Sequence, residues 1–161
     1  MIALVRVDNR LIHGQVVEAW LPYLKVQRVV VADDEAAQSP LIRAAMGLAI
    51  QDSVEVKIEP LSAVDFRALS SDPTKTLLLL RDVAAVLSAR RAGLALPRLN
   101  LGNVHYGSGR RQVSASVFLS QDELDQLKLL GDDGVEVEAQ GVPSDSPVRL
   151  LQLTERFVQG G

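Results

Sequence analysis

Hydrophobic residues recur along the chain with two different periods, and the two periods alternate. Short β-branched or leucine-rich runs predict strands, whereas apolar residues spaced three and four apart predict amphipathic helices. The expected strands are residues 2–7, 27–32, 53–58, 76–80 and 97–101, and the expected helices are residues 14–24, 39–51, 61–70, 82–92 and 120–130. Strands that alternate with helices in this way indicate an α/β fold with a mostly parallel sheet.

The pattern changes after Gly102. Residues 103–120 contain two short strands around a glycine-rich turn, which predicts an antiparallel hairpin that closes the sheet. Ser120 followed by Glu123 is a capping-box pattern and predicts where the next helix begins. A final strand is expected at residues 135–139, and a final helix is expected within residues 146–158.

No repeat, low-complexity segment or linker divides the chain. We therefore expect a single domain over residues 1–161. Its fold class is α/β: an open, mostly parallel sheet flanked by helices, with an antiparallel hairpin near the C-terminal part.

Composition narrows the function classes. With 161 residues the chain is long enough for one sizeable core, and 47% hydrophobic residues, 23% charged residues and a net charge of −3 are ordinary values. The basic residues are scattered and aromatic residues are few, so we expect no nucleic-acid partner. The absence of cysteine excludes disulfides, zinc–thiolate sites and thiol catalysis. No apolar run approaches the ~20 residues that span a bilayer, so we expect a soluble, cytoplasmic protein without direct membrane insertion.

Polar residues collect where the expected strands end. His13 follows the first strand, and Asp33, Asp34 and Glu35 follow the second. Arg81 and Asp82 follow the fourth strand, and residues 103–109 follow the fifth. The carboxyl ends of parallel strands share one edge of an open sheet, where ligands bind. We call this edge the rim.

His13 lies between the first strand and the first helix. A histidine in this position has three chemical uses: general acid or base, metal ligand, or nucleophile that carries a phosphoryl group. The third use suits the position best, because free amides and the positive end of a helix dipole stabilise an anion on the ring. Gly14 leaves room for that anion, and Arg10 supplies a planar donor fork for phosphate oxygens. Residue chemistry alone leaves a capping or packing role open.

The stretch RVDNRLIHGQVVEAW, residues 6–20, resembles the opening of the IIB components of the mannose/fructose/sorbose class of the bacterial sugar phosphotransferase system. The typical pattern there is Arg-Ile/Val-Asp-x-Arg-Leu-Ile/Leu-His-Gly-Gln-Val followed by a Trp. The resemblance continues in the same order through RVVVADDEAA, NLGNVHYGSGRRQVSASVFLSQDEL and GVPSD, at residues 28–37, 100–124 and 141–145. It thus spans essentially the whole chain.

The resemblance implies a phosphocarrier that works as a phosphotransferase. His13 would accept a phosphoryl group on Nδ1 from a phosphohistidine of a separate IIA protein, and would pass it to a sugar entering through the membrane proteins IIC and IID. Arg10 would help bind the phosphate, and Asp8, Gly14 and Gln15 would support the site. The resemblance implies no metal and no organic cofactor. The identity of the sugar and any homo-oligomer are left open.

Other polar residues have a functional and a structural interpretation. Asp8 would orient the His13 ring through a hydrogen bond, or it is ordinary turn chemistry after a strand. Asp34 and its acidic neighbours would bind a cation together with His13, but such runs are usually solvated turns or helix starts. His105 would lie near the phosphate or a partner protein, or it is a loop residue. Arg6, within the first strand, is expected to be buried against a carboxylate.

Two rival functions remain. The first is a regulatory phosphocarrier that keeps His13 but has no cognate sugar permease. The second is an enzyme that binds a nucleotide or another small phosphate compound at the rim. The sequence contains no Gly-x-x-x-x-Gly-Lys-Ser/Thr loop, and Gly107-Ser108-Gly109 does not have dinucleotide-binding spacing, which weakens the second rival.

Overall fold

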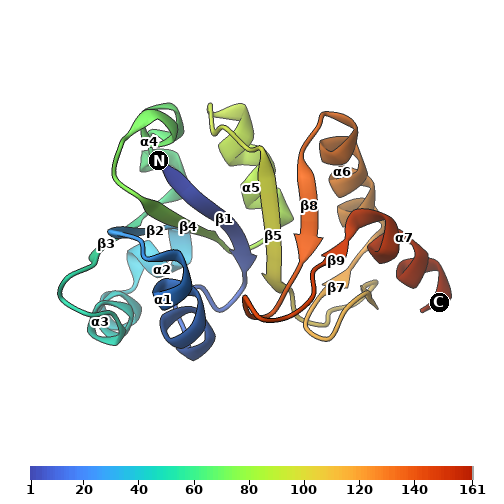
Figure 1. Ribbon diagram of the computed structural model, residues 1–161, viewed down its shortest axis with the longest axis horizontal. Helices are drawn as coiled ribbons and strands as arrows, with labels where there is room; N and C mark the ends of the chain where they lie inside the picture. Colours follow the sequence, from blue (N-terminus) through green and yellow to red (C-terminus); the bar gives the residue numbers. More distant parts are fainter. Residues whose placement is uncertain (161) are drawn as a thin grey trace.

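A sheet of seven strands forms the centre of the computed structural model, which describes residues 1–160 (Figure 1). All neighbouring strands are parallel except the last pair, β8 and β9. In spatial order the strands are β3 (Glu55–Glu59), β2 (Arg28–Ala32), β4 (Thr76–Leu80), β1 (Ile2–Asp8), β5 (Arg98–Asn103), β8 (Glu136–Ala139) and β9 (Val148–Arg149). The prediction of a mostly parallel α/β sheet is therefore confirmed.

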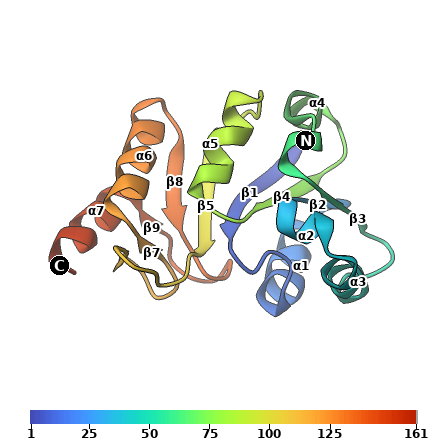
Figure 2. The ribbon, with the colours of Figure 1, turned by 180° about the vertical axis from the view of Figure 1, so that it is seen from behind.

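Helices cover the sheet on opposite faces. The helical elements are the π-helical segment η1 (Val16–Trp20), α1 (Leu21–Leu24), α2 (Asp34–Gln38), α3 (Pro40–Ala49), the 3₁₀ turn η2 (Leu61–Ala63), α4 (Phe66–Ser71), α5 (Val83–Arg91), α6 (Gln121–Asp132) and α7 (Leu150–Gln159). One apolar cluster joins α1 and α3 to the sheet, and a second joins α4, α5, α6 and α7 to the other face, which Figure 2 brings forward.

The central strands are apolar on both faces because helices cover both. Every residue of β2 and β4 is buried, as the runs RVVVA and TLLLL predict. Alternate residues of a strand point to opposite faces, so Leu77 and Leu79 join the α1 cluster while Leu78 and Leu80 join the α5 cluster. Burial of each such leucine contributes about 1.5–3 kcal/mol.

In the part of the sheet formed by β5, β8 and β9, one face is apolar and the other is polar. Leu99, Leu101 and Val137 pack in the cluster of α5, α6 and α7. The alternate positions of the same strands are polar, and no part of the α1 cluster comes from β5, β8 or β9. The face of β5, β8 and β9 on the same side of the sheet as α1 is called the open face. In Figure 1 it lies to the right of α1.

The C-terminal part corrects two predictions. The hairpin exists as β6 (Arg111–Gln112) and β7 (Phe118–Leu119), but it forms a separate antiparallel pair and does not close the main sheet. The strand predicted at 135–139 is not the last, because β9 follows it and supplies the antiparallel edge. β9 has two residues, too few to show the alternation that predicts a strand. Because β9 occupies the start of the segment 146–158, the last helix begins only at Leu150.

Two helix predictions need smaller corrections, and the predicted capping box needs none. The acidic run after β2 begins the short helix α2, which we had expected only as a turn or helix start, and Asp33 caps it by accepting from the Ala36 amide. The segment 61–70 divides into η2 and α4, since Asp65 caps a new helix by accepting from Ala68 N–H. The capping box of Ser120 and Glu123 is confirmed. Within residues 1–160, no helix combines the length and hydrophobicity required to cross a bilayer.

Candidate functional site

A short loop carries the chain from β1 to the first helix, and two buried side chains hold it. Leu11 and Ile12 are 1% and 7% exposed. Leu11 has a φ of 58°, a left-handed conformation that costs a non-glycine residue about 1–2 kcal/mol. Burial of its side chain offsets that cost. The loop is thereby fixed, and His13 is held at the point where the helix begins.

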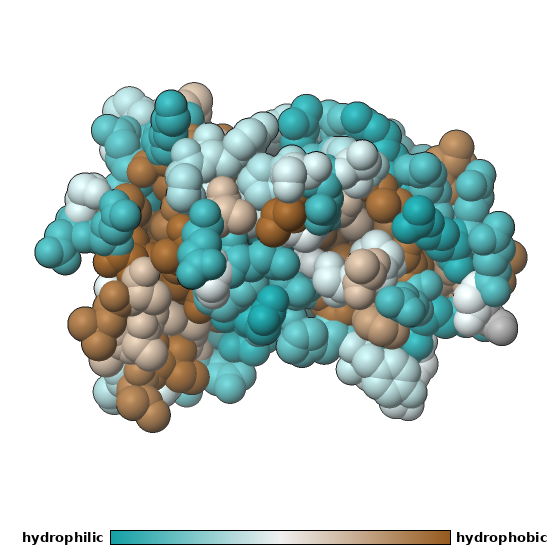
Figure 3. Space-filling view, turned by 60° about the horizontal axis from the view of Figure 1, so that its bottom comes forward, coloured by the Kyte–Doolittle hydropathy of each residue, from teal (hydrophilic) through white to brown (hydrophobic). Residues whose placement is uncertain are grey.

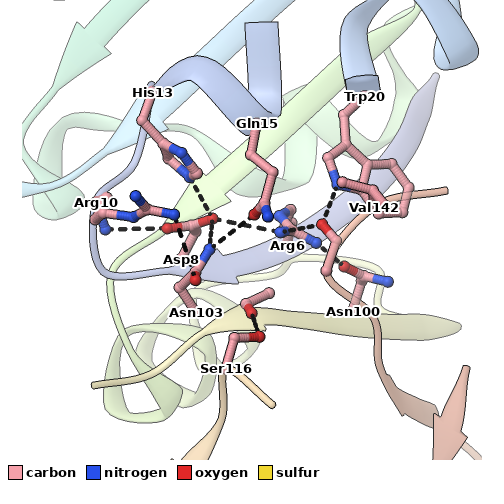
Figure 4. Close-up of polar contacts among 12 residues, drawn as sticks. Arg6, Asp8, Arg10, His13, Gln15, Trp20, Asn100, Asn103, Ser116 and Val142 are labelled. Atoms are coloured by element: carbon pink, nitrogen blue, oxygen red, sulfur yellow. Dashed lines mark hydrogen bonds and ion pairs between the residues drawn. The ribbon is translucent and has the colours of Figure 1, made fainter. Parts of the chain in front are cut away.

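The ring of His13 contacts the carboxylate of Asp8 (Figure 4). Nε2 of His13 lies 2.8 Å from Oδ2 of Asp8, whose side chain is fully buried, while the His13 side chain is 12% exposed. An ionised carboxylate only accepts hydrogen bonds, so the proton of a neutral His13 ring belongs on Nε2. Nδ1 then carries the free lone pair, and no residue among 1–160 forms a hydrogen bond with it.

Asp8 is held by four groups from three segments. Oδ1 accepts from the Arg10 backbone N–H at 3.0 Å, and Oδ2 accepts from Asn103 Nδ2 at 2.8 Å as well as from His13. Arg6 Nη2 lies 3.4 Å from the same oxygen. Burial raises the pKa of Asp8, but the hydrogen bonds from His13 and Asn103 and the nearby positive charges lower it more, so the pKa lies below its ordinary value. Asp8 is therefore a fixed carboxylate at neutral pH.

Arg6 is buried beneath the site, against a carboxylate as expected. Its Nη1 donates to Asn100 Oδ1 at 2.6 Å and to the Gln140 carbonyl at 2.8 Å. Burial lowers the pKa of Arg6 to about 10, although Asp8 opposes the shift, so the guanidinium stays charged near neutral pH. A Cβ at position 102 would lie 2.1 Å from Arg6 Cζ, which only glycine avoids.

Several hydrogen-bond donors lie near His13 and are available to an anion. The Val17 amide bonds to the His13 carbonyl and closes the first helical turn, so the amides of residues 14–16 precede any intrahelical acceptor. A Cβ on Gly14 would meet nothing within 4 Å, so the approach to the ring is open there. Arg10 is exposed, with Nη2 3.5 Å from Asn103 Oδ1. Gln15 Oε1 accepts from Asn103 Nδ2 at 3.2 Å.

The remaining predicted residues lie outside this network. Asp34 Oδ1 accepts from the Leu61 amide at 2.8 Å and so ties α2 to η2. His105 is exposed, and its carbonyl accepts from Arg110 Nη1. Asp33 pairs with Arg81 through two bonds of 2.8 and 2.9 Å. In the chain up to residue 160, no group of three histidine or acidic side chains is arranged to hold a metal ion.

Two residues at the rim were not identified as site residues from the sequence. Asn103 was noted only as part of the polar segment after the fifth strand, yet its amide joins Asp8, Gln15 and Arg10 across 88 to 95 positions of sequence. Arg81 was likewise noted only as a rim residue, and it contacts the His13 loop at the Asn9 carbonyl, 3.4 Å away. The available signal was their position directly after parallel strands.

The surface around the rim is mostly hydrophilic. Figure 3 turns the bottom of Figure 1 forward and shows a hydrophilic centre with an apolar area at one end. Leu41 and Leu48 of α3 are among the most exposed apolar side chains, at 80% and 88%. The His13 side chain itself is 12% exposed.

Comparison with known proteins identifies the family. Residues 2–159 match the family described as PTS system sorbose subfamily IIB component. An N-acetylgalactosamine-specific phosphotransferase enzyme IIB component 2 of Escherichia coli is 33% identical over 94% of this chain and 98% of its own length. The crystal structure of manxB from Thermoanaerobacter tengcongensis is 30% identical with a TM-score of 0.87, covering 98% of this chain and 96% of that one.

A second solved structure gives the same result. The IIBSor domain of the sorbose permease from Klebsiella pneumoniae is 27% identical, with a TM-score of 0.85 over 96% of each chain. Both the sequence match and the fold extend over nearly the whole chain, in agreement with the resemblance noted in the motif around His13. The chain therefore belongs to the sorbose subfamily of IIB components of the bacterial sugar phosphotransferase system.

Proposed function

We propose that this chain carries phosphoryl groups on Nδ1 of His13, taking them from a IIA protein and passing them to a sugar delivered by the membrane proteins IIC and IID. The reaction class is a protein phosphohistidine–sugar phosphotransfer. The sugar-specific names of the relatives support transport over a purely regulatory carrier. The observation that carries the proposal is the bond between His13 Nε2 and Asp8, which leaves Nδ1 as the free nucleophile.

In the first step the lone pair of Nδ1 attacks the phosphorus of the donor. The N–P bond of the donor phosphohistidine breaks as the new N–P bond forms. The Nε2 proton stays on the ring, where Asp8 stabilises the positive charge that develops as the phosphoryl group arrives. Asp8 also prevents rotation of the ring, so the same nitrogen faces each partner.

The incoming phosphoryl oxygens need donors, and the helix start supplies them. The amides of residues 14–16 are free of intrahelical acceptors, and each charge-assisted bond contributes about 1.5–3 kcal/mol. Arg10 is exposed and loosely held by Asn103, so it is free to turn toward the phosphate. In the second step a sugar hydroxyl attacks phosphorus and loses its proton to solvent as the P–Nδ1 bond breaks, and the ring, with its proton still on Nε2, returns to its neutral form.

The test compares the two histidines of the chain. Purified IIA phosphorylated on histidine should label the wild type and His105→Ala, and should leave His13→Ala unlabelled. The linkage should be labile in acid and stable in alkali. Label that persists in His13→Ala would contradict the assignment. In a second experiment, transfer from labelled wild-type protein to a panel of sugars in the presence of IIC and IID would identify the acceptor.

A further inference from the structure

A groove lies on the open face, between the first helix and β9. It has a volume of about 360 Å³. Trp20 and Tyr23 form one wall, and Glu138 and Gln140 of β8 and the loop after it lie on the floor. The groove is separate from the His13 site, whose histidine and aspartate do not line it. Its volume is in the range of small-molecule sites.

Glu138 on the floor is buried and has no partner. It is 6% exposed, and neither of its oxygens forms a hydrogen bond or ion pair with any residue in 1–160. The cations around it are used elsewhere. Arg98 Nη2 bonds to Glu136 at 3.1 Å, and Arg149 Nη1 bonds to the other oxygen of Glu136.

The neutral donors near Glu138 are also used. Asn100, its neighbour across the β5–β8 ladder, donates through Nδ2 to Gln140 Oε1 at 3.3 Å. The amide of Gln140 donates to two backbone carbonyls, those of Pro143 and Asp145. The carboxylate oxygens of Glu138 are not among the fully enclosed polar atoms that lack a partner, so they face the open groove. A ligand that brings donors into the groove would give this carboxylate hydrogen-bond partners that the described residues do not supply.

We propose that the groove binds a neutral polyhydroxylated ring of monosaccharide size, with hydroxyl groups that donate to Glu138. The two carboxylates and two arginines at the groove balance in charge, which favours a neutral ligand over an ion. A hydroxyl both donates and accepts, so neighbouring hydroxyls satisfy a carboxylate and a guanidinium together. The ring of Tyr23, a residue that is 66% exposed, offers an apolar surface for the C–H face of the ligand.

The groove is connected to the His13 site through the sheet. Glu138, Asn100 and Arg6 are neighbours in one row across β8, β5 and β1. Arg6 donates to Asn100, lies over the Trp20 ring at 4.9 Å, and contacts Asp8. The proposed site therefore lies two side chains from the carboxylate that holds His13. The inference depends on the open face and not on phosphoryl transfer.

Trp20 is the single tryptophan of the chain, so its fluorescence reports on the groove. We would titrate the unphosphorylated protein with neutral hexoses, ketohexoses and N-acetylhexosamines, and separately with hexose 6-phosphates, to distinguish free sugars from phosphorylated ones. At least one neutral sugar should give a saturable change with a Kd at or below about 10 mM. Glu138→Gln should weaken that binding at least about tenfold, equivalent to about 1.4 kcal/mol.

Two controls make the result decisive. Glu155→Gln, on the exposed side of α7, should bind like the wild type, and heteronuclear NMR should show ligand-induced shifts at Tyr23 and Arg149. The Glu138 side chain forms no hydrogen bond or ion pair within residues 1–160, so the melting temperature of Glu138→Gln should equal that of the wild type, which excludes misfolding as the cause of weaker binding. The proposal is overturned by the absence of saturable binding for every neutral sugar, by binding of the phosphates alone, or by equal affinity in Glu138→Gln.

Discussion

Two aspartates at the rim, Asp8 at the end of β1 and Asp33 directly after β2, occupy similar positions and have different surroundings. Both are buried, both contact an arginine, and both have a pKa below the ordinary value. Asp33 uses its oxygens to pair with Arg81 and to cap α2. Asp8 directs one oxygen to a partly exposed histidine.

The difference shows what separates a structural carboxylate from a functional one. The partners of Asp33 are an arginine and a backbone amide, neither of which is a nucleophile at neutral pH. The partner of Asp8 is an imidazole with a free nitrogen beside unoccupied helix amides. Burial and a lowered pKa are common to both sites, so these properties do not identify the active one. The exposed nucleophile does.

Exchanging each aspartate for asparagine should separate the two sites most clearly. Asp8→Asn removes the acceptor that fixes the Nε2 proton and the charge that stabilises the phosphorylated ring. Single-turnover transfer from phosphorylated IIA should fall about 100-fold, equivalent to about 2.7 kcal/mol. The variant should also lose about 3 kcal/mol of stability, because Arg6 keeps its buried charge without its carboxylate partner. A transfer rate within threefold of the wild type would show that Asp8 only supports the fold.

Asp33→Asn should have the opposite profile. Asparagine is a good helix cap, so the loss is mainly that of the partly exposed pair with Arg81, about 1 kcal/mol of unfolding free energy in a urea titration. Transfer should stay within about threefold of the wild type, since His13 keeps every contact. A large loss of transfer at unchanged stability would mean that Asp33 and Arg81 belong to the reacting site.

Arg10→Gln should reduce transfer by about 10–100-fold, equivalent to about 1.4–2.7 kcal/mol, since it removes a charged donor for the phosphate. Arg10→Lys should have a smaller effect because it keeps the charge but not the planar fork. Stability should change little, as the side chain is exposed. Denaturant midpoints measured beside the rates provide the check, and a variant that unfolds would assign Arg10 a structural role instead.

Acid should reduce the contribution that the Asp8 and Asp33 carboxylates both make to the free energy of unfolding. Asp8 and Asp33 have folded-state pKa values below 3.8, so they bind fewer protons folded than unfolded. Their contribution to stability is complete above that pH and is lost as the pH falls through the folded-state values. The stability difference between the wild type and Asp33→Asn, measured by urea unfolding, should be constant from about pH 7 to pH 5 and shrink toward pH 3. A difference that grows on acidification would contradict the pKa direction.

Most of the fold could be predicted from sequence because its signals are local. The apolar runs of β2 and β4 and the capping box at Ser120 need no knowledge of distant residues. β9 and α2 were missed because two and five residues carry no period. The hairpin was expected in the main sheet because its turn is visible in the sequence, whereas its pairing partners are not.

The site was predictable only in part. The position of His13 between a strand and a helix, with Arg10 three residues before it, predicts an anion site, and the family motif contains both residues. The left-handed Leu11 and the contacts of Asn103 depend on packing between segments far apart in the chain. Asp8 fits both of its interpretations, because it contacts the His13 ring at 2.8 Å and also accepts from the Arg10 backbone N–H two residues on.

The central claim is that Asp8 holds Nε2 so that Nδ1 carries the phosphoryl group. The most direct measurement is ¹⁵N and ³¹P NMR of ¹⁵N-histidine-labelled protein before and after phosphorylation by IIA. Before phosphorylation, the His13 resonances should show the proton on Nε2, and afterwards the phosphorus coupling should lie on Nδ1. A phosphorus coupling on Nε2, or a free ring protonated mainly on Nδ1, would contradict the account.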